Sequence, residues 1–139
     1  MASLESIFAA LETEYRHDAS PGERRCAREA LAAVKADAGS CFSVARATLA
    51  LPPGNDAVAF FGLGCLERVA TAFWNGLDGE SRAATRALAL GAGRATADGE
   101  APFLRNKKAA VLAAVALREF PQHWPGFVGD VLACVEINR

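Results

Sequence analysis

Residues 102–125, PFLRNKKAAVLAAVALREFPQHWP, constrain the fold of this chain more than any other stretch. Pro102 suits the first turn of a helix, where its missing N–H costs nothing, and neither Gly nor Pro follows until Pro121. Ala, Leu, Arg and Lys dominate this interval, and they are strong helix formers. The apolar residues follow two overlapping helical stripes, which indicates a helix covered on more than one side. The residues after Pro121 predict a stiff corner that leads into another helix: His123, Trp124 and Pro125.

The remaining segments also repeat apolar residues at helical spacing, and none alternates with the period of two that a strand needs. Helix-start signals, including a capping box, separate these segments: Ser20-Pro21-Gly22-Glu23, Asn55 or Asp56, and Asp78. Gly39 is expected to end one helix, and residues 94–101 are expected to form a flexible loop. The sequence therefore predicts an all-α chain of about eight helices, and those it delimits lie near residues 3–16, 21–38, 40–49, 56–75, 79–93, 102–120 and 127–135.

Broadly apolar helices alternate with amphipathic ones along the chain, as they do in stacked helical arrays. The pattern Leu-x-x-Val recurs at Leu31, Leu66 and Leu112, with separations of 35 and 46 residues. These separations bracket the repeat length of about 40–47 residues in HEAT and armadillo proteins. A HEAT-like solenoid, an α-α superhelix of helix pairs, is therefore the favoured architecture, and a compact bundle is the alternative. Gly62 and Gly64 within one predicted helix indicate close approach of a neighbouring helix.

Charge and cysteine content exclude several classes of function. The net charge is −1 and the isoelectric point about 6.1, so no global basic field argues for nucleic-acid binding. The four cysteines form no C-x-x-C pair, which predicts reduced thiols in the core rather than a zinc or redox site. The longest apolar run, residues 109–117, is too short to span a bilayer, and no secretory leader is recognised at the N-terminus. We therefore expect a soluble, intracellular protein without membrane insertion.

The search for catalytic and cofactor motifs finds no site. The Gly-x-Gly strings at residues 62–64 and 91–93 lack the third glycine of a dinucleotide fingerprint, and no strand precedes either of them. His17 and His123 are far apart in sequence, and neither has a second ligand at metal spacing. No G-x-S-x-G nucleophile elbow is present. We expect neither an enzyme nor a bound cofactor or metal.

One charged feature lies near the start of the 102–120 helix. It is a basic cluster of Arg105, Lys107 and Lys108. The cluster is either a solvated helix end or a contact for an acidic partner surface.

Two strings carry a resemblance to a known family. They are FLRNK at residues 103–107 and REFPQHWPGF at residues 118–127, and the strings FGL at 61–63 and WNGL at 74–77 agree with them. Over about residues 25–135, the chain resembles the exportin/importin-beta-like domain of nuclear transport receptors. Within that family it is most similar to the exportin that carries structured RNA such as pre-microRNA, and then to the tRNA exportin.

The resemblance implies a HEAT solenoid whose N-terminal arch binds the GTP-bound form of the small GTPase Ran. It implies that the second helix of each early repeat provides the contacts, here at residues 21–38, 56–75 and 102–119. It also implies RNA or protein cargo, nucleoporins as further partners, and shuttling between nucleus and cytoplasm. The candidate Ran contacts are polar residues on these helices: Arg68, Asn106, Lys107 and Lys108.

Family members are long arrays, whereas this chain has roughly three repeats. The resemblance therefore implies that residues 1–139 are the N-terminal HEAT-repeat segment of a longer receptor, with most cargo contacts elsewhere. A second hypothesis needs no GTPase: a generic helical-repeat scaffold that binds another protein. Preference for the GTP form of Ran would separate the two. Apolar residues continue to the last turn, so an array ending there would expose them: Val131, Leu132, Val135 and Ile137.

Overall fold

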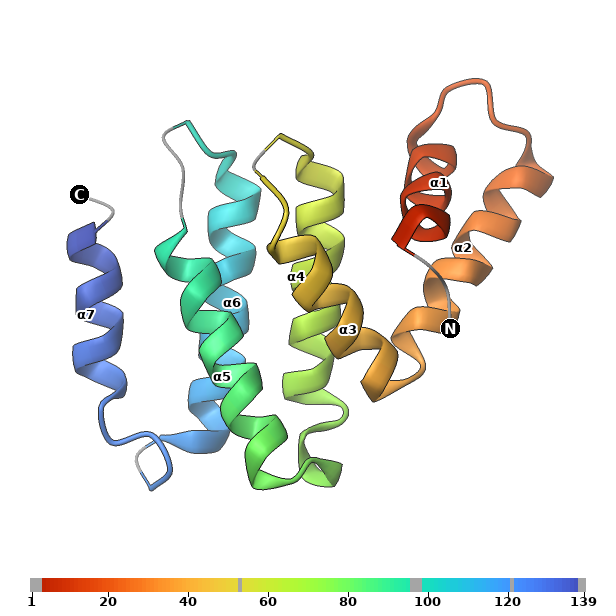
Figure 1. The fold of residues 1–139 in the computed structure, drawn as a ribbon. Coiled ribbons are helices and arrows are strands. Elements are labelled where there is room, and N and C mark those ends of the chain that lie inside the picture. Colours follow the sequence, from red (N-terminus) through yellow and green to blue (C-terminus); the bar gives the residue numbers. More distant parts are fainter. Residues whose placement is uncertain (1–3, 53, 96–98, 121, 138–139) are drawn as a thin grey trace.

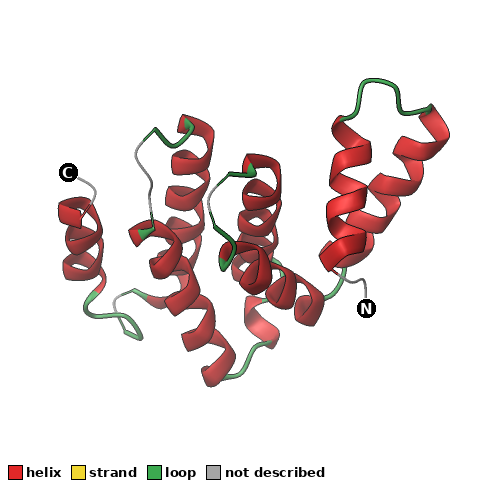
Figure 2. Cartoon of the chain, turned by 45° about the horizontal axis from the view of Figure 1, so that its top comes forward, coloured by secondary structure: helices red, strands yellow, loops and turns green. Residues whose placement is uncertain are grey.

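The computed structural model describes residues 4–52, 54–95, 99–120 and 122–137, with no side-chain description beyond Cys134. Helices and their connecting loops make up all of this described part, which confirms the all-α fold class (Figure 2). Over the same residues the structure has seven α-helices and one 3-10 turn, against the eight or so helices predicted. The elements are α1 (Leu4–Tyr15), α2 (Pro21–Lys35), α3 (Ala38–Leu49), α4 (Asp56–Thr71), η1 (Trp74–Gly76), α5 (Gly79–Arg94), α6 (Pro102–Glu119) and α7 (Phe127–Ile137).

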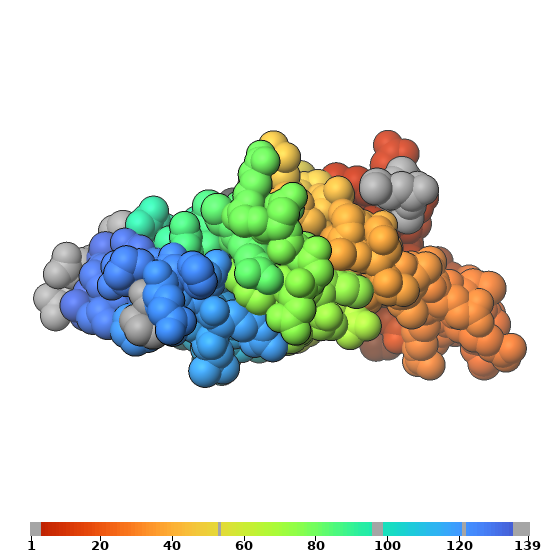
Figure 3. Space-filling model, turned by 90° about the horizontal axis from the view of Figure 1, so that it is seen from below, coloured from red at the N-terminus to blue at the C-terminus, as the bar shows by residue number. Residues whose placement is uncertain are grey.

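The helices follow one another from side to side, and odd-numbered helices run opposite to even-numbered ones (Figure 1). Consecutive helices form antiparallel pairs, α1 with α2, α3 with α4 and α5 with α6. Helix α4 packs extensively on both α3 and α6, while α7 packs on α5. In Figure 1, α3 and α5 lie in front of α4 and α6, so the centre of the molecule has two layers. The molecule is elongated, with α1 and α2 at one end and α7 at the other (Figure 3).

Helices α2, α4, α5 and α6 each begin at a local signal that the sequence predicted. Ser20 Oγ accepts a hydrogen bond from the Glu23 backbone N–H at 3.1 Å, and the Glu23 carboxylate accepts one from the Ser20 N–H at 3.3 Å. This reciprocal capping box confirms the predicted start of α2. Asn55 caps α4 and Asp78 caps α5, and Pro102 is the first residue of α6.

The boundary between α2 and α3 differs from the prediction that Gly39 ends a helix at about residue 38. Helix α2 ends at Lys35, and Gly39 lies in the first turn of α3. The reason is Asp37, whose carboxylate accepts a hydrogen bond from the Ser40 backbone N–H at 2.8 Å. Because Asp37 is the N-cap of α3, that helix begins at Ala38, and Gly39 is a residue of its first turn rather than the end of α2.

Helix α4 also ends earlier than predicted, at Thr71 rather than near residue 75. The WNGL string forms a short 3-10 turn instead, and the Trp74 side chain is buried within it. The Arg82 guanidinium donates to the Trp74 carbonyl oxygen at 3.1 Å and lies 5.5 Å from the indole ring centroid. The turn is therefore held by α5 rather than by continuation of α4.

The core is centred on α4, which packs on both α3 and the 102–120 helix that the sequence analysis began with. Leu63 and Leu66 have no exposed surface, and Val69 is 1% exposed. A Cβ atom at Gly62 would lie 2.0 Å from the Thr48 hydroxyl oxygen of α3, which confirms the expected close approach of a neighbouring helix. Gly64 differs, because α3 does not contact it and the nearest atoms belong to the flexible end of a lysine side chain.

All four cysteines are free thiols, and three of them lie in the core as expected: Cys41, Cys65 and Cys134. Burial raises the pKa of Cys65 to about 12, because the thiolate would lose its hydration there. Burial likewise raises the pKa of Cys41. The prediction was wrong for Cys26, which is exposed, because α2 turns the next residue, Ala27, toward the core.

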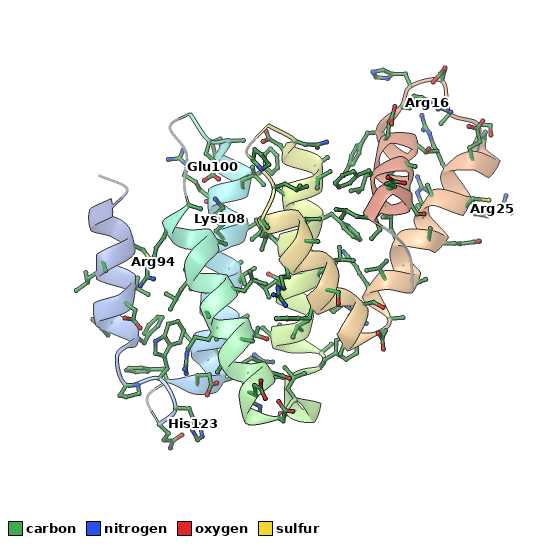
Figure 4. All side chains as sticks on the ribbon, viewed as in Figure 1. Arg16, Arg25, Arg94, Glu100, Lys108 and His123 are labelled. Carbon is green, nitrogen blue, oxygen red and sulfur yellow. The ribbon has the colours of Figure 1, made fainter. Side chains whose placement is uncertain are left out.

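The predicted corner after α6 is built around Trp124, which is 3% exposed. Its ring centroid lies 5.0 Å from that of Phe127, and its indole N–H donates to the Asp130 carboxylate at 2.7 Å. The turn is therefore tied to the first turns of α7. His123 is exposed and lies at the lower edge of Figure 4.

Some expectations fall outside the described residues. They concern the helix stop at Pro121, the tip of the 94–101 loop at residues 96–98, and the side chains of Val135 and Ile137. Within the described part, no helix combines the length and apolarity needed to cross a bilayer.

Candidate functional site

The C-terminal end of α2 approaches α4 and α6 on one face of the molecule, which we call the even-helix face. These three are the helices that the sequence analysis singled out as second members of each pair. A groove of about 410 Å³ lies where they meet, and we call it the Gly64 groove. Its lining residues come from all three helices: Ala32, Lys35, Ala36, Gly64, Glu67, Arg68, Thr71 and Lys107.

Lys35 and Arg68 form one wall of the Gly64 groove. Arg68 Nε donates a 2.6 Å hydrogen bond to the backbone carbonyl of Lys35, so the end of α2 is fastened to α4. Lys35 Nζ lies 5.4 Å from the ring centroid of Phe61, and Arg68 Cζ lies 5.4 Å from that of Phe73. Among the described residues, no carboxylate forms an ion pair with either cation.

Lys107 and Glu67 also line the groove. Lys107 Nζ lies 2.9 Å from Glu67 Oε1, and the two side chains are 22% and 32% exposed. The same ammonium group lies 5.3 Å from the ring centroid of Phe60. Because Glu67 is neutralised by Lys107, the groove keeps an excess of positive charge from Lys35 and Arg68.

The groove is open because small residues line it. A Cβ atom at Gly64 would lie 3.6 Å from Lys35 Nζ, which is ordinary van der Waals contact. Ala32 of α2 and Ala36, which follows that helix, are exposed and also line the groove. A larger side chain at Gly64 would therefore project into the space beside the Lys35 ammonium.

An exposed aromatic pair lies next to Lys107 on the same face. The rings of Phe60 in α4 and Phe103 in α6 have centroids 5.6 Å apart in an edge-to-face arrangement. Their exposed fractions are 37% and 48%, high for phenylalanine in the middle of a packed helical layer. Aromatic residues and Arg are enriched at protein interfaces, so the aromatic pair and Arg68 fit a protein-binding surface, whereas Lys is depleted there.

The structure brings together only some of the four residues predicted to contact a partner. Arg68 and Lys107 line the Gly64 groove, and Asn106 is exposed on α6 beside Lys107. Lys108 does not belong to this surface. It forms an ion pair with Glu100 in which the side chains are only 11% and 9% exposed, in the upper half of α5 and α6 as drawn in Figure 4.

The separation of Lys107 from Lys108 follows from helical geometry. Successive residues project about 100° apart, so adjacent lysines point to different sides. Lys108 lines a separate cavity of about 340 Å³, shared with residues at the ends of α3 and α5. Sequence reasoning missed Lys35, Phe60 and Phe103, although all three lie on helices it had delimited. Of the groove residues, the sequence analysis had proposed Arg68 and Lys107 as partner contacts.

No protein-family model matches the chain, and no curated protein matches it. Among the described residues, no group of three or more His, Cys, Asp or Glu side chains could hold a metal ion. The arrangement is an open groove lined by cationic side chains, with an exposed aromatic pair beside it.

Proposed function

We propose that this chain is a HEAT-like segment of a nuclear transport receptor that binds the GTP-bound form of Ran through its even-helix face. The observation that carries the proposal is the meeting of α2, α4 and α6 around the Gly64 groove. These are the helices at which the sequence resemblance implies GTPase contacts. Unpaired cations and an exposed aromatic pair on this face give it the residue types that bind proteins.

The arrangement of the helix pairs supports the repeat architecture within this proposal. Helix α4 contacts α6 in one layer, and α3 contacts α5 in the other. Equivalent helices of these two pairs therefore lie side by side and run in the same direction (Figure 1), whereas in the first pair α1 contacts α4 and α2 contacts α3. A solenoid produces this order because each repeat contacts mainly its neighbours. The proposal includes RNA or protein cargo bound mostly elsewhere, contacts with nucleoporins, and shuttling between nucleus and cytoplasm.

The first test is binding of the chain to Ran loaded with a non-hydrolysable GTP analogue or with GDP, at physiological salt. A transport receptor must prefer the GTP form. Equal affinity for both forms, by a chain shown to be folded and monomeric, would overturn the Ran proposal. It would favour the second candidate, a helical-repeat scaffold without GTPase dependence, which the even-helix face supports equally well.

A charge reversal on the even-helix face makes the test specific. Lys107→Glu should weaken binding of Ran-GTP, chiefly through the association rate and the salt dependence. Arg94→Glu is the matched control, because Arg94 is exposed at the end of α5, away from this face (Figure 4). Reversal at Lys108 is not a suitable test, since it would break the nearly buried ion pair with Glu100 and destabilise the fold.

A further inference from the structure

The Gly64 groove has a more specific feature than general positive charge. We propose that it binds an acidic side chain of a protein partner, with the carboxylate over Gly64 between Lys35 and Arg68. The inference rests on the proposed function only in taking the even-helix face as the partner surface. An acidic residue in the groove would anchor a partner protein on this face whether or not that partner is Ran.

The two cations are placed to receive such a carboxylate. Lys35 Nζ lies 3.6 Å from the position that a Cβ atom would occupy at Gly64, so an acidic group above that glycine is within ion-pair distance. Arg68 uses Nε to hold the Lys35 carbonyl, and its two terminal nitrogens make no hydrogen bond to another described residue. Both cations line the groove, and no carboxylate among the described residues forms an ion pair with them.

The local charges favour an acidic protein segment over nucleic acid. Phosphate backbones are bound by extended basic surfaces, whereas this chain has a net charge of −1. Within the groove, Glu67 and Lys107 already neutralise each other, so the excess charge suits one or two carboxylates. Lys107 also contacts Phe60, so apolar residues that flank the acidic group could pack on the adjoining aromatic pair.

The experiment uses a probe that does not depend on Ran. A short fluorescein-labelled peptide of alternating Asp and Glu, flanked by Gly and Ser, is titrated with the chain and followed by anisotropy. Its counterpart contains Asn and Gln instead. The acidic peptide should bind and the amide peptide should not, and added salt should weaken binding because the contact is electrostatic.

Gly64→Asp provides the decisive variant. The new carboxylate would lie beside Lys35 and occupy the site from within, so the chain should stay folded while binding of the acidic peptide is lost. Gly91→Asp is the matched control, because it adds the same charge to helix α5 at an exposed glycine with open space around it. Equal losses in the two variants would mean that total charge, not the groove, controls binding.

Two further substitutions should act in opposite directions. Lys35→Met keeps an unbranched side chain against Phe61 but removes the charge, and should weaken peptide binding about ten-fold. Glu67→Gln releases Lys107 from its ion pair, and should strengthen binding. If the acidic peptide fails to bind, or if Gly64→Asp and Lys35→Met bind it like the unmodified chain, the groove proposal is overturned.

Parallel titration with Ran-GTP separates the two proposals. If the chain binds the acidic peptide but not Ran-GTP, the groove proposal stands and the Ran proposal is overturned. Conversely, if the chain binds Ran-GTP and neither Gly64→Asp nor Lys35→Met changes that affinity, the Ran proposal stands. The groove is then not the site that anchors the partner.

Discussion

Helices α4 and α7 are both strongly apolar in sequence, yet the structure treats them very differently. Helix α4 packs on α3 and α6 and also touches α1 and α5, and much of its length is buried. Helix α7 packs mainly on α5. Among its described side chains Cys134 alone is buried, while Val128 and Leu132 are each 56% exposed.

The difference shows that burial depends on a helix's place in the array as well as on its own sequence. An internal helix has neighbours in both layers and on both sides, whereas an end helix has them on one side only. Leu117 near the end of α6 is 83% exposed. Helix α6 is thus well covered toward α4 and α5 and uncovered on the side of Leu117, although Val115 and Glu119 nearby are buried. Apolar composition alone is therefore a poor guide to which side chains hold this fold together.

The sharpest test compares two leucines from these helices. Leu66→Ala should lower the free energy of unfolding by about 2–5 kcal/mol, because Leu66 is fully buried and the substitution leaves a cavity. Leu132→Ala should change it by no more than about 0.5 kcal/mol, because the side chain is already largely in water. Urea unfolding followed by far-UV circular dichroism measures both. Similar losses would show that α7 is covered in solution by something that buries Leu132.

Two glycines in α4 extend the comparison to a single helix. Gly62→Ala should destabilise the chain by about 1–3 kcal/mol, because its Cβ would lie 2.0 Å from the Thr48 hydroxyl oxygen. Gly64→Ala should instead stabilise it by about 0.4–1 kcal/mol, because its Cβ meets only Lys35 and alanine favours helix.

A double-variant cycle checks the cause of the loss at Gly62. Thr48→Ala removes the hydroxyl group that the new methyl group would meet, so the combined variant should lose less than the two single losses added together. If the two losses of unfolding free energy simply added, the strain at Gly62→Ala would not come from contact with the Thr48 hydroxyl group.

The features that the sequence predicted well are local ones. The capping box at Ser20 and the caps at Asn55 and Asp78 depend on residues within one turn, and they set the helix starts correctly. Gly39 was misread because a nearby cap, Asp37, competed with it. The glycine stop and the Asp37 cap are both local signals. The prediction was wrong because it gave the glycine more weight than the cap.

The candidate site was predicted only in part because it depends on packing between distant residues. The direction of Lys107 and Lys108 is set by where α4 and the residue Glu100 lie, and a basic cluster in sequence does not contain that information. Lys35 joins the groove through its backbone contact with Arg68, 33 residues away. Such a contact has no sequence signature in one chain alone.

The corner before α7 provides a third test. Trp124→Phe removes the indole N–H that donates to the Asp130 carboxylate at 2.7 Å, and should lower stability by about 1–2 kcal/mol. Because α7 has few other contacts, hydrogen exchange should accelerate there while α4 stays protected. Asp130→Asn keeps an oxygen acceptor and should have a smaller effect. Equal acceleration in both helices would mean that α7 does not open separately.

Lowering the pH should weaken the N-caps of α3 and α5 but not the N-cap of α4. We expect this change in stability to be the smallest of the four predicted here. Backbone N–H groups of Ser40 and Ser81 donate to Asp37 and Asp78 and hold the pKa of each carboxyl below its ordinary value of 3.8. The stability that these ionised caps contribute is therefore complete above pH 3.8 and is lost as pH falls through the lower folded-state pKa. Asn55 does not titrate, so the start of α4 should keep its cap throughout. The difference in unfolding free energy between the chain and its Asp78→Asn variant should shrink below pH 3.8, and a difference independent of pH would contradict this role of the carboxylate.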